Sequence, residues 1–597
     1  MSSLVLKEKP FLATTAIEQF WDLSHPIIFL GDWCLRYSRK AAWEKLEYKI
    51  IHSPLEDKGR FYEAYQYADN LYERALPILG ERLNGIHNTN HDLHYWRIVV
   101  GPWLMHYIYI LYDRYLSLKS AIETYPNFVT IGLPEEDFIT PRDTWDFIIL
   151  SCNDPYNLQT YTRILHYLGR DYSLKKLKIE SLPSTNPEKR SFLKTIFNFI
   201  SNGVLRYYPF IIKHSYISSH LAEIELFIKS AGKIWFDYYL VHELPFIELN
   251  FKTRASLENI ELIDSEFENL FVSLLSLDLP KCFVEGYVTV GDIVERSYPF
   301  KPKAIFCTEA WYADEVFKRW AAGCCEKGVD LYGIQYGADY GIAPHLPFLK
   351  HELSITKFFY SWGFEETGYT AKVKQMPATK FIGRKEIGVS NKKKDILLVT
   401  NVFPRYLYRF QDILNYDNAA YFSWQQRFAA ALGLEWRRHL RVRLFGDGWG
   451  RDCEQRWRDS YPDVRLEQYW DAPFLKSLER CRIHVSDHLA STFLEGLVAN
   501  KPTILFWDPK VFPVKAEVQP FFDELKDAGI LYDSPEEAAS AVCSAYPDVE
   551  SWWNDFSRQS VRKRFCNLFA KTSPDAVSQW AAEFRRIARE GTAKENE

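Results

Sequence analysis

Residues 396–545 alternate short apolar runs with longer amphipathic stretches, and this alternation limits the fold more than any other feature of the chain. The runs are too short for helices, whereas the stretches between them have apolar residues at helical spacing. Strands that alternate with helices form a doubly wound parallel sheet with helices on both faces. The predicted strands are 396–401, 442–448, 482–487 and 502–507, and the predicted helices include 419–437 and 491–500.

A second α/β unit lies earlier in the chain. Its predicted elements are a strand at 303–309, a helix at 310–328 and further strands at 329–337 and 358–364. A strand, helix and strand in this order give a parallel pair with a right-handed crossover. Residues 365–394 lose this periodicity and end in a charged run, so we place the interdomain linker there. We therefore expect an N-terminal lobe at 1–385 and a C-terminal lobe at 386–597.

The rest of the N-terminal half predicts a helix-rich insertion. A short buried strand from Ile27 to Leu30 ends at Gly31-Asp32, and residues 145–151 form a second strand candidate. Residues 59–120 have the spacing of long helices, and 191–208 also have a helical pattern. The tail, with Trp552, Trp553 and Phe565, is expected to be helical and to pack back across the first lobe.

Composition excludes several classes of function. Among 597 residues, Lys and Arg number 73 and Asp and Glu 78, so the net charge of −5 gives no reason to expect nucleic-acid binding. The ten cysteines are scattered without zinc-site spacing, which is typical of reduced, buried thiols. We see no signal-peptide pattern and no apolar run of about 18 residues that could span a membrane. We expect a cytoplasmic protein, with room for a peripheral contact with the inner membrane face.

The segment 486–507 predicts an anion site. A strand ends at Ser486-Asp487, and Ser491 and Thr492 begin a helix whose unpaired amides and dipole favour a phosphate. Glu495 lies one turn later and could reach the hydroxyls of a ribose. The alternative is a plain helix start, with Ser491 or Thr492 as the N-cap and Glu495 closing a capping box.

Three further loops follow predicted strands and are candidates for binding the same donor. GIQYGADYG at 333–341 offers Gln335, Gly337 and Tyr340, although it does not match a dinucleotide fingerprint. Gly446 lies in a glycine-rich turn, and Arg405 could pair with a pyrophosphate or carboxylate. The alternatives are structural turns and a solvated loop arginine.

Acid or base candidates come from the N-terminal lobe. Asp32 and Glu309 each follow a predicted strand, and His94 lies in a polar-rich helical region. Arg97, Asp113 and Arg114 are candidates for binding the acceptor. The alternatives are loop carboxylates, helix caps and polar helix packing. His87, His91 and His94 lack a metal-binding motif such as HExxH, so we predict no metal.

These segments together resemble a known family. Four separated segments occur in the order found in a family of transferases: FLGDWC, LNGIHNTNHDLHYWRIVVGPWL, GIQYGADYG and SDHLASTFLEGLVANKPTILFWD. That family was first named from a spirochaete protein and is encoded in bacterial surface-carbohydrate loci. The C-terminal half is similar to GT-B glycosyltransferases of capsule synthesis, in which a Ser/Thr pair grips the nucleotide phosphate. Those enzymes often have Gln-His-Gly where this chain has Tyr336 at the centre. They also often have a His-Pro pair in the C-terminal lobe, whereas the His-Pro pair here is His25-Pro26.

The resemblance implies a GT-B-like fold of two Rossmann-like lobes, with C-terminal helices that pack back across the cleft. It also implies a metal-independent glycosyltransferase that needs no cofactor. The co-substrate would be a nucleotide-sugar, such as CMP-Kdo or another CMP-nonulosonate, and the acceptor a growing or lipid-linked glycan of a surface polysaccharide. The alternatives are a phosphotransferase of the CDP-glycerol type and a non-catalytic scaffold of polysaccharide assembly.

Overall fold

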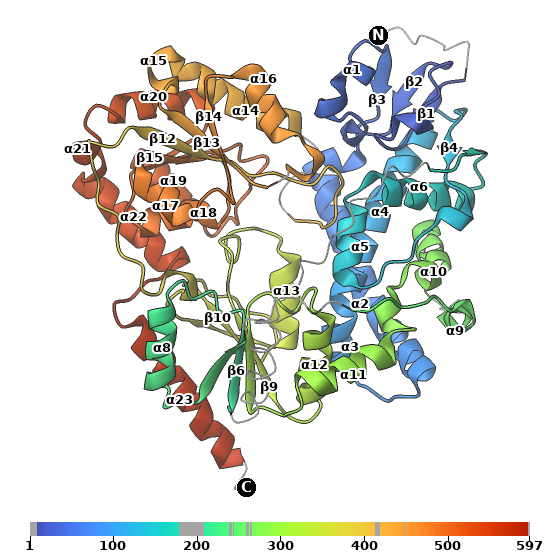
Figure 1. Cartoon of the computed structure of the whole chain (residues 1–597), viewed down its shortest axis with the longest axis horizontal. Helices are drawn as coiled ribbons and strands as arrows, with labels where there is room; N and C mark the ends of the chain where they lie inside the picture. The colour runs from blue at the N-terminus through green and yellow to red at the C-terminus, as the bar shows by residue number, and fades with distance from the viewer. Residues whose placement is uncertain are drawn as a thin grey trace.

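Two six-stranded parallel sheets form the centres of two lobes in the computed structural model (Figure 1). The structure describes residues 9–177, 208–237, 242, 244–257, 262, 265–411, 418–446 and 448–594. The helical stretch predicted at 191–208 lies outside these residues except for its last position. The chain passes from the first sheet to the second between Gln375 and Asp395.

The sheet of the N-terminal lobe has the order β11-β10-β9-β8-β6-β7. Alternate side chains along each strand point to opposite faces. Phe210 and Phe306 pack under helices α8 and α23, whereas Ile211 and Ile305 face helix α12 and the helices of the N-terminal half. The strands are β6 (Phe210–Lys213), β7 (Ile234–Asp237), β8 (Ala304–Cys307), β9 (Asp330–Ile334), β10 (Phe358–Ser361) and β11 (Lys372–Gln375). The helices are α8 (His220–Lys229), α11 (Tyr287–Ser297), α12 (Glu315–Cys325) and α13 (Pro347–Ile355).

The sheet of the C-terminal lobe has the order β14-β13-β12-β15-β16-β17. Leu505 packs with helices α18, α19 and α22, whereas Ile504 and Phe506 pack with α14 and α20 on the other face. The strands are β12 (Asp395–Val399), β13 (Leu440–Leu444), β14 (Arg465–Gln468), β15 (Cys481–Ser486), β16 (Thr503–Phe506) and β17 (Leu531–Tyr532). The helices are α14 (Asn418–Ala431), α15 (Gly433–Arg437), α16 (Cys453–Ser460), α17 (Phe474–Arg480), α18 (Ser491–Val498), α19 (Gln519–Asp527) and α20 (Pro535–Ala545).

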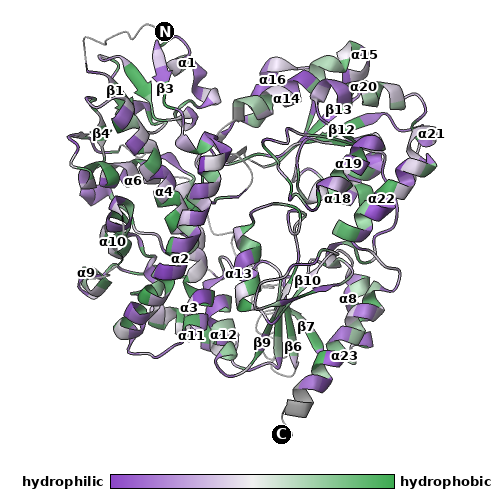
Figure 2. Cartoon of the chain, turned by 180° about the vertical axis from the view of Figure 1, so that it is seen from behind, coloured by the Kyte–Doolittle hydropathy of each residue, from purple (hydrophilic) through white to green (hydrophobic). Residues whose placement is uncertain are grey.

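A helical region and a small separate sheet flank both lobes (Figure 1). The main helices are α2 (Lys58–His87), α3 (Leu93–Val99), α4 (Gly101–Thr124), α5 (Thr144–Ser151), α6 (Asp154–Tyr167) and α10 (Glu266–Asp278). The small sheet pairs β1 (Phe11–Ala13), β2 (Ile27–Phe29) and β3 (Tyr48–Ile50) in parallel. Hydropathy is highest along the buried strands and mixed along the outer helices (Figure 2).

The C-terminal helices return to the first lobe, as predicted. After α21 (Val549–Trp553), helix α22 (Phe556–Phe569) packs on the C-terminal lobe, and α23 (Ala576–Lys594) packs Trp580 and Phe584 against the N-terminal sheet. Gly363 has φ of 138°, and a Cβ there would lie 2.4 Å from the Leu568 carbonyl oxygen, so a larger residue would separate the tail from the lobe. Two Rossmann-like lobes with a returning tail confirm the predicted α/β, GT-B-like fold class.

Three local predictions need correction. Residues 145–151 belong to helix α5 and not to a strand, because Asp143 caps the helix by accepting a hydrogen bond from the Asp146 amide at 2.8 Å. A short apolar run does not distinguish a buried strand from a buried helix. The strand that precedes Asp32 exists as β2, but it lies in the small sheet and not in the lobe sheet. The stretch taken as a linker includes strand β11.

Candidate functional site

In the N-terminal sheet, the strand order reverses between β6 and β8, because β7 lies on one side of β6 and the later strands lie on the other. Ligands of open α/β sheets bind at such a point, beyond the carboxyl ends of the strands. His214 follows β6, and Thr308 and Glu309 follow β8. The Thr308 hydroxyl donates to the His214 carbonyl at 2.6 Å, and His214 Nδ1 lies 3.6 Å from Glu309 Oε1. The predicted Glu309 is therefore at a reversal point.

The C-terminal sheet reverses between β12 and β15, and Asp487 directly follows β15. The Tyr421 hydroxyl accepts from the Asn401 amide at 2.8 Å and donates to Asp487 Oδ1 at 2.9 Å, which connects the ends of both strands. His488 Nδ1 lies 2.8 Å from Asp487 Oδ1, and its Nε2 lies 3.0 Å from the Thr492 hydroxyl. Asp487 is 2% exposed, so this carboxylate orients the loop that leads into α18.

The first turn of α18 has no side-chain cap. Its N-cap is Ala490, which makes no side-chain hydrogen bond, and Ser491 is the first helical residue. The alternative of a Ser or Thr cap with a capping box is therefore wrong. The first amides of a helix have no partner within the helix. The Ser491 hydroxyl instead accepts a hydrogen bond from Lys380 Nζ at 2.9 Å.

Two cations that we did not predict hold Glu495. Lys380 Nζ lies 3.0 Å from Glu495 Oε1, and Arg384 Nη1 donates to Oε2 at 2.6 Å. All three side chains are mostly buried, because Lys380, Arg384 and Glu495 are 16%, 13% and 7% exposed. Lys380 and Arg384 come from the crossing segment between the lobes, which we interpreted as a linker. In the sequence, the signal that could have identified them is their spacing of four residues in a segment without other clear patterns.

Glu309 lies within electrostatic reach of this cluster. Burial alone would raise the pKa of its carboxyl, but hydrogen bonds from His214 and Tyr216, and the charges of His214 and Lys380, outweigh burial and lower the pKa. Glu309 is therefore an ionised carboxylate at neutral pH. Lys380 therefore acts on a group at the strand reversal of one lobe and contacts the start of α18 in the other.

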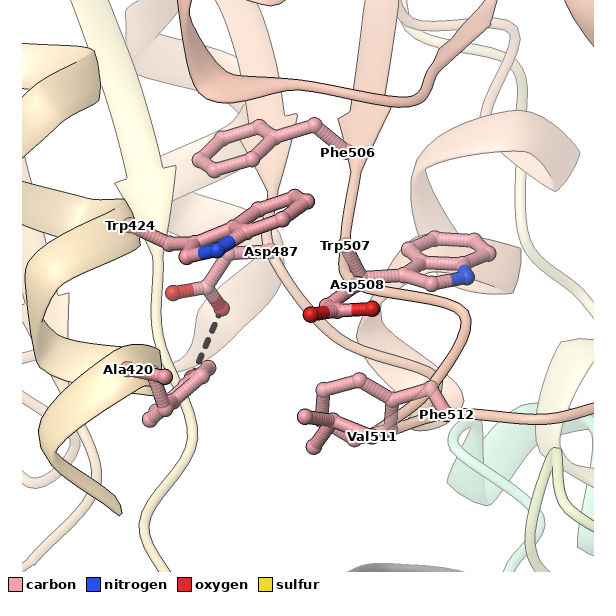
Figure 3. A pocket seen from close by; sticks show the side chains of 9 residues that line it. Ala420, Trp424, Asp487, Phe506, Trp507, Asp508, Val511 and Phe512 are labelled. Atoms are coloured by element: carbon pink, nitrogen blue, oxygen red, sulfur yellow. Dashed lines mark hydrogen bonds between the residues drawn. The ribbon is translucent and has the colours of Figure 1, made fainter. Parts of the chain in front are cut away.

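Two adjoining hollows border this region and share Phe512. One is an open hollow between the lobes of about 280 Å³, including space open to solvent, with Asp339 and Ala343 from the first lobe and Gln411 and Leu489 from the second. The other is an open hollow of about 260 Å³, measured in the same way. Figure 3 shows the carboxylates of Asp487 and Asp508 in the second hollow, between the rings of Trp424 and Phe512.

The glycine-rich loop after β9 shapes the cleft mainly through its backbone. Gln335 is 1% exposed, donates to the Gly337 carbonyl at 2.8 Å and accepts from the Trp362 amide at 2.6 Å. Tyr340 is buried and stacks on Phe359 with ring centroids 5.7 Å apart. Gln335 and Tyr340 therefore support the loop from behind and do not present their side chains to a donor. Burial raises the pKa of Asp339, which lines the interlobe hollow.

Arg405 and Asp32 make contacts between modules. Arg405 is 6% exposed, pairs with Asp154 and donates to the Trp33 carbonyl at 2.5 Å. Burial alone would raise the pKa of Asp154, but Arg405 outweighs it and the pKa is lowered. Asp32 accepts from Arg451 Nη1 at 2.9 Å. Arg405 is thus a buried structural arginine, and Asp32 connects the small sheet to the C-terminal lobe.

The predicted acceptor residues separate into two groups. Asp113 and Arg114 are 2% and 0% exposed, and Arg114 donates to Asp113, Asn157 and the Leu407 carbonyl. Burial leaves these two side chains no surface for an acceptor, which corrects that prediction. Arg97 is partly exposed and forms two hydrogen bonds with Glu73, at 2.9 and 2.7 Å.

Arg97 lines a crevice of about 290 Å³ between α2, α4 and α13. His94, its neighbour on α3, is half-buried, and burial lowers its pKa. The structure does not bring His94 into contact with Glu309 or α18 in any described interaction, so its predicted catalytic role stays a prediction.

Exposed aromatic rings lie at the carboxyl ends of β13 and β14. Phe445 stacks on Tyr469 with centroids 5.8 Å apart, and Tyr469 contacts Trp470 edge-on at 4.9 Å. Their exposed fractions are 51%, 52% and 60%, which is unusual for such large rings. Gly446, with φ of 54°, lies against Tyr469. We did not single out Tyr469 and Trp470, because no strand was predicted at β14, which precedes them.

Within the described part of the chain, no three His, Cys, Asp or Glu side chains are grouped so that they could bind a metal ion. No helix among the same residues is both long and apolar enough to cross a membrane.

The chain is distantly similar to several solved structures. Trehalose-6-phosphate synthase OtsA is 10% identical over 64% of this chain and 98% of its own, with a TM-score of 0.35. MurG from Acinetobacter baumannii is 10% identical over 63% and 99%, with a TM-score of 0.32. Spinosyn forosaminyltransferase SpnP is 12% identical over 64% and 99%, with a TM-score of 0.31. Similarities at this level support no inference about activity.

No curated protein matches the chain significantly. One family model, described as LIC12162 family transferase, matches residues 10–584. This match spans nearly all of the sequence, including both lobes and the returning tail. The chain belongs to the LIC12162 family of transferases.

Proposed function

We propose that this transferase is a glycosyltransferase that moves a sugar from a nucleotide-activated donor and holds the nucleotide phosphate at the start of α18. The observation that supports this most is the uncapped first turn of α18, which has Lys380 and Arg384 beside it at the strand reversal of the C-terminal sheet. The amides of a helix start, the positive end of the helix dipole and two cations together favour an anionic leaving group.

The same arrangement explains how the reaction could proceed without a metal. The leaving nucleotide gains negative charge as the bond to the sugar breaks, and preorganised donors stabilise that charge best in a water-poor cleft. Glu495 pairs with both Lys380 and Arg384, so it offsets one of their two positive charges. A bound phosphate would share these cations, and Glu495 would then be able to accept a hydrogen bond from a ribose hydroxyl.

Glu309 is the best-placed base for an acceptor hydroxyl. Its carboxylate is partly exposed and is ionised because its pKa is lowered, in part by the charge of Lys380, which also contacts Ser491 of α18. A general base must be ionised and within reach of the proton that it removes. The exposed rings of Tyr469 and Trp470 would stack on the nucleobase, because planar bases bind well to aromatic faces.

The family resemblance supports a more specific proposal. The donor would be CMP-Kdo or another CMP-nonulosonate, and the acceptor a lipid-linked or growing surface polysaccharide. The cations near the donor site suit a sugar that has its own carboxylate. Incubating the protein with CMP-, CDP-, UDP- and GDP-linked donors, CDP-glycerol among them, and measuring nucleotide release would identify the class.

The phosphate site is tested by calorimetric titration with CMP, CDP, UDP and GDP. Lys380→Met and Arg384→Met should each weaken the best nucleotide about tenfold to a hundredfold, since a hydrogen bond to a charged group is worth about 1.5–3 kcal/mol. Lys526→Met removes a lysine paired with Asp533 at the edge of the lobe, and it should leave affinity unchanged. Unchanged affinity in both site variants, with melting temperatures showing intact folds, would refute the proposed site.

The role of Glu309 is tested separately. Glu309→Gln should abolish transfer while nucleotide affinity stays the same, because the side chain keeps its shape and loses only its charge. Full transfer activity in this variant would exclude Glu309 as the base.

A further inference from the structure

Helix α8 has an exposed apolar stripe on the outside of the N-terminal lobe. Leu221, Ile224 and Ile228 are 79%, 56% and 67% exposed, and their spacing places them on one face of the helix. The opposite face packs Leu226 against the core that contains Trp580. Burying α8 against the lobe therefore does not explain the stripe. Contiguous apolar surface of this kind usually marks a contact site.

Basic side chains border the stripe. Lys229 lies at the end of α8, and Arg585 of the adjacent helix α23 donates a hydrogen bond to the Lys229 carbonyl. Arg589 follows Arg585 by one helical turn, so both side chains lie on the same face of α23. Arg585 and Arg589 are both exposed. The acidic residues of α8 add little unpaired negative charge to this surface. Glu225 pairs with Lys229 at 2.7 Å, and Glu223 is buried.

The stripe begins beside the proposed donor site. Ser218, just before α8, donates to the Lys380 carbonyl at 3.2 Å and accepts from Arg384 Nε at 3.5 Å. Ser219, the N-cap of α8, lies against Gly383. The segment that supplies the two cations of the cleft therefore contacts the first turn of α8. A surface bound to α8 would therefore lie next to the segment that supplies these two cations.

We propose that α8, together with the basic face of α23, docks on a bilayer that contains anionic phospholipid. Aliphatic side chains would enter the boundary between headgroups and acyl chains, and Arg585 and Arg589 would contact lipid phosphates. Three aliphatic side chains provide only a fraction of the roughly 800 Å² per partner that a standard protein interface buries, which argues against a second copy as the occupant.

The benefit of this docking rests on the proposed function, because a membrane would deliver a lipid-linked acceptor to the cleft. The docking itself does not depend on that function. Vesicle binding and nucleotide binding can therefore fail independently of each other.

The test is co-sedimentation of the full chain with vesicles of phosphatidylcholine alone or with about 30% phosphatidylglycerol. The full chain should bind the anionic vesicles, and high salt should weaken binding because the attraction is screened beyond about 10 Å. The triple variant Leu221→Ser, Ile224→Ser, Ile228→Ser should reduce binding about tenfold or more, since each buried aliphatic side chain contributes substantially. Arg585→Gln with Arg589→Gln should reduce binding to anionic vesicles only.

The matched control is Leu434→Ser with Phe556→Ser, which removes two exposed apolar side chains from helices of the other lobe. This control should bind vesicles as the unmodified chain does. Nucleotide affinity of the triple variant should stay unchanged, which separates this result from a failure of the donor site. No binding to anionic vesicles, or full binding by the triple variant, would overturn the proposal. A dimer seen by light scattering that the triple variant dissolves would assign the stripe to a second copy instead.

Discussion

Gly496 sits in the middle of α18, where the packing of one small residue fixes the position of the proposed phosphate site. A Cβ at this position would lie 2.3 Å from His484 Nδ1 and 3.0 Å from the Thr503 hydroxyl. Both neighbours are fully buried in adjacent strands, so neither side chain can move out into solvent. Burial also lowers the pKa of His484 to about 3, so the ring is neutral. Gly496→Ala should therefore push α18 away from the sheet.

The magnitude follows from two opposing effects. Overpacking a closed site costs about 1–3 kcal/mol. Replacing a helical glycine by alanine gains about 0.4–1 kcal/mol through helix propensity and the less flexible unfolded chain. The clash should win, with a net loss of about 1–2 kcal/mol. For a lobe of this size, each kcal/mol lowers the melting temperature by about 2–4 °C.

The assay is thermal unfolding together with nucleotide titration. Gly496→Ala should lower the melting temperature and weaken nucleotide binding, because the first turn of α18 moves with the helix. Gly323→Ala in α12 is the matched control, since a Cβ there meets no atom within 4 Å and the variant should be stabilised. If Gly496→Ala is stabilised to the same degree as Gly323→Ala, the packing of α18 against β15 is not as the structure shows.

Three further predictions concern charge and stacking. Burial raises the pKa of Glu352 well above 4.5, so the folded chain keeps a proton that the unfolded chain loses as pH rises. Glu352→Gln should therefore raise the free energy of unfolding more at pH 8 than at pH 4, by about 1.4 kcal/mol for each unit of pKa shift, and an equal rise of the melting temperature at both pH values would contradict this. Because the pKa of Asp154 is lowered below 3.8, its pairing with Arg405 stabilises the fold at neutral pH and is lost as pH falls through the folded pKa. Asp154→Asn should cost about 3–5 kcal/mol at pH 7 and less near pH 3, as measured by chemical unfolding at both pH values. Trp470→Ala should weaken nucleotide binding about 5-fold to 150-fold, since stacking on one base is worth about 1–3 kcal/mol, whereas Trp145→Ala on exposed α5 should not.

Much of the strand and helix order could be predicted because each element has its own period of apolar residues, whereas strands β6, β7, β11 and β14 were not predicted. The strands β8, β9 and β12 lie within a few residues of their predicted bounds. The error at α5 has a physical reason, since a seven-residue apolar run fits either a buried strand or a buried helix until the role of Asp143 as a cap is known. The small sheet around β2 could not be predicted, because the local sequence does not indicate which strands a short apolar strand pairs with.

The candidate site was predictable only in part, because its chemistry depends on partners that are distant in the sequence. Ser491 and Glu495 were visible as the start of a helix, but Lys380 and Arg384 reach them from a segment more than one hundred positions away. Arg405 looked free in the sequence because its partner Asp154 belongs to another module. Burial of this kind follows from tertiary packing and not from local pattern.

The two reversal points give the position of the cleft a single structural cause. Each lobe builds its sheet outward in both directions from its first strand, so each has one crevice at the carboxyl edge. His214 and Glu309 occupy one crevice, and Asp487 with the start of α18 occupies the other. The returning tail packs against the N-terminal lobe at Gly363. The crossing segment places Lys380 where its charge acts on Glu309 of the first crevice and pairs with Glu495 of the second. Any change that separates the lobes should therefore remove Lys380 from Glu309 and Ser491 together, which makes this lysine the most direct probe of cleft closure.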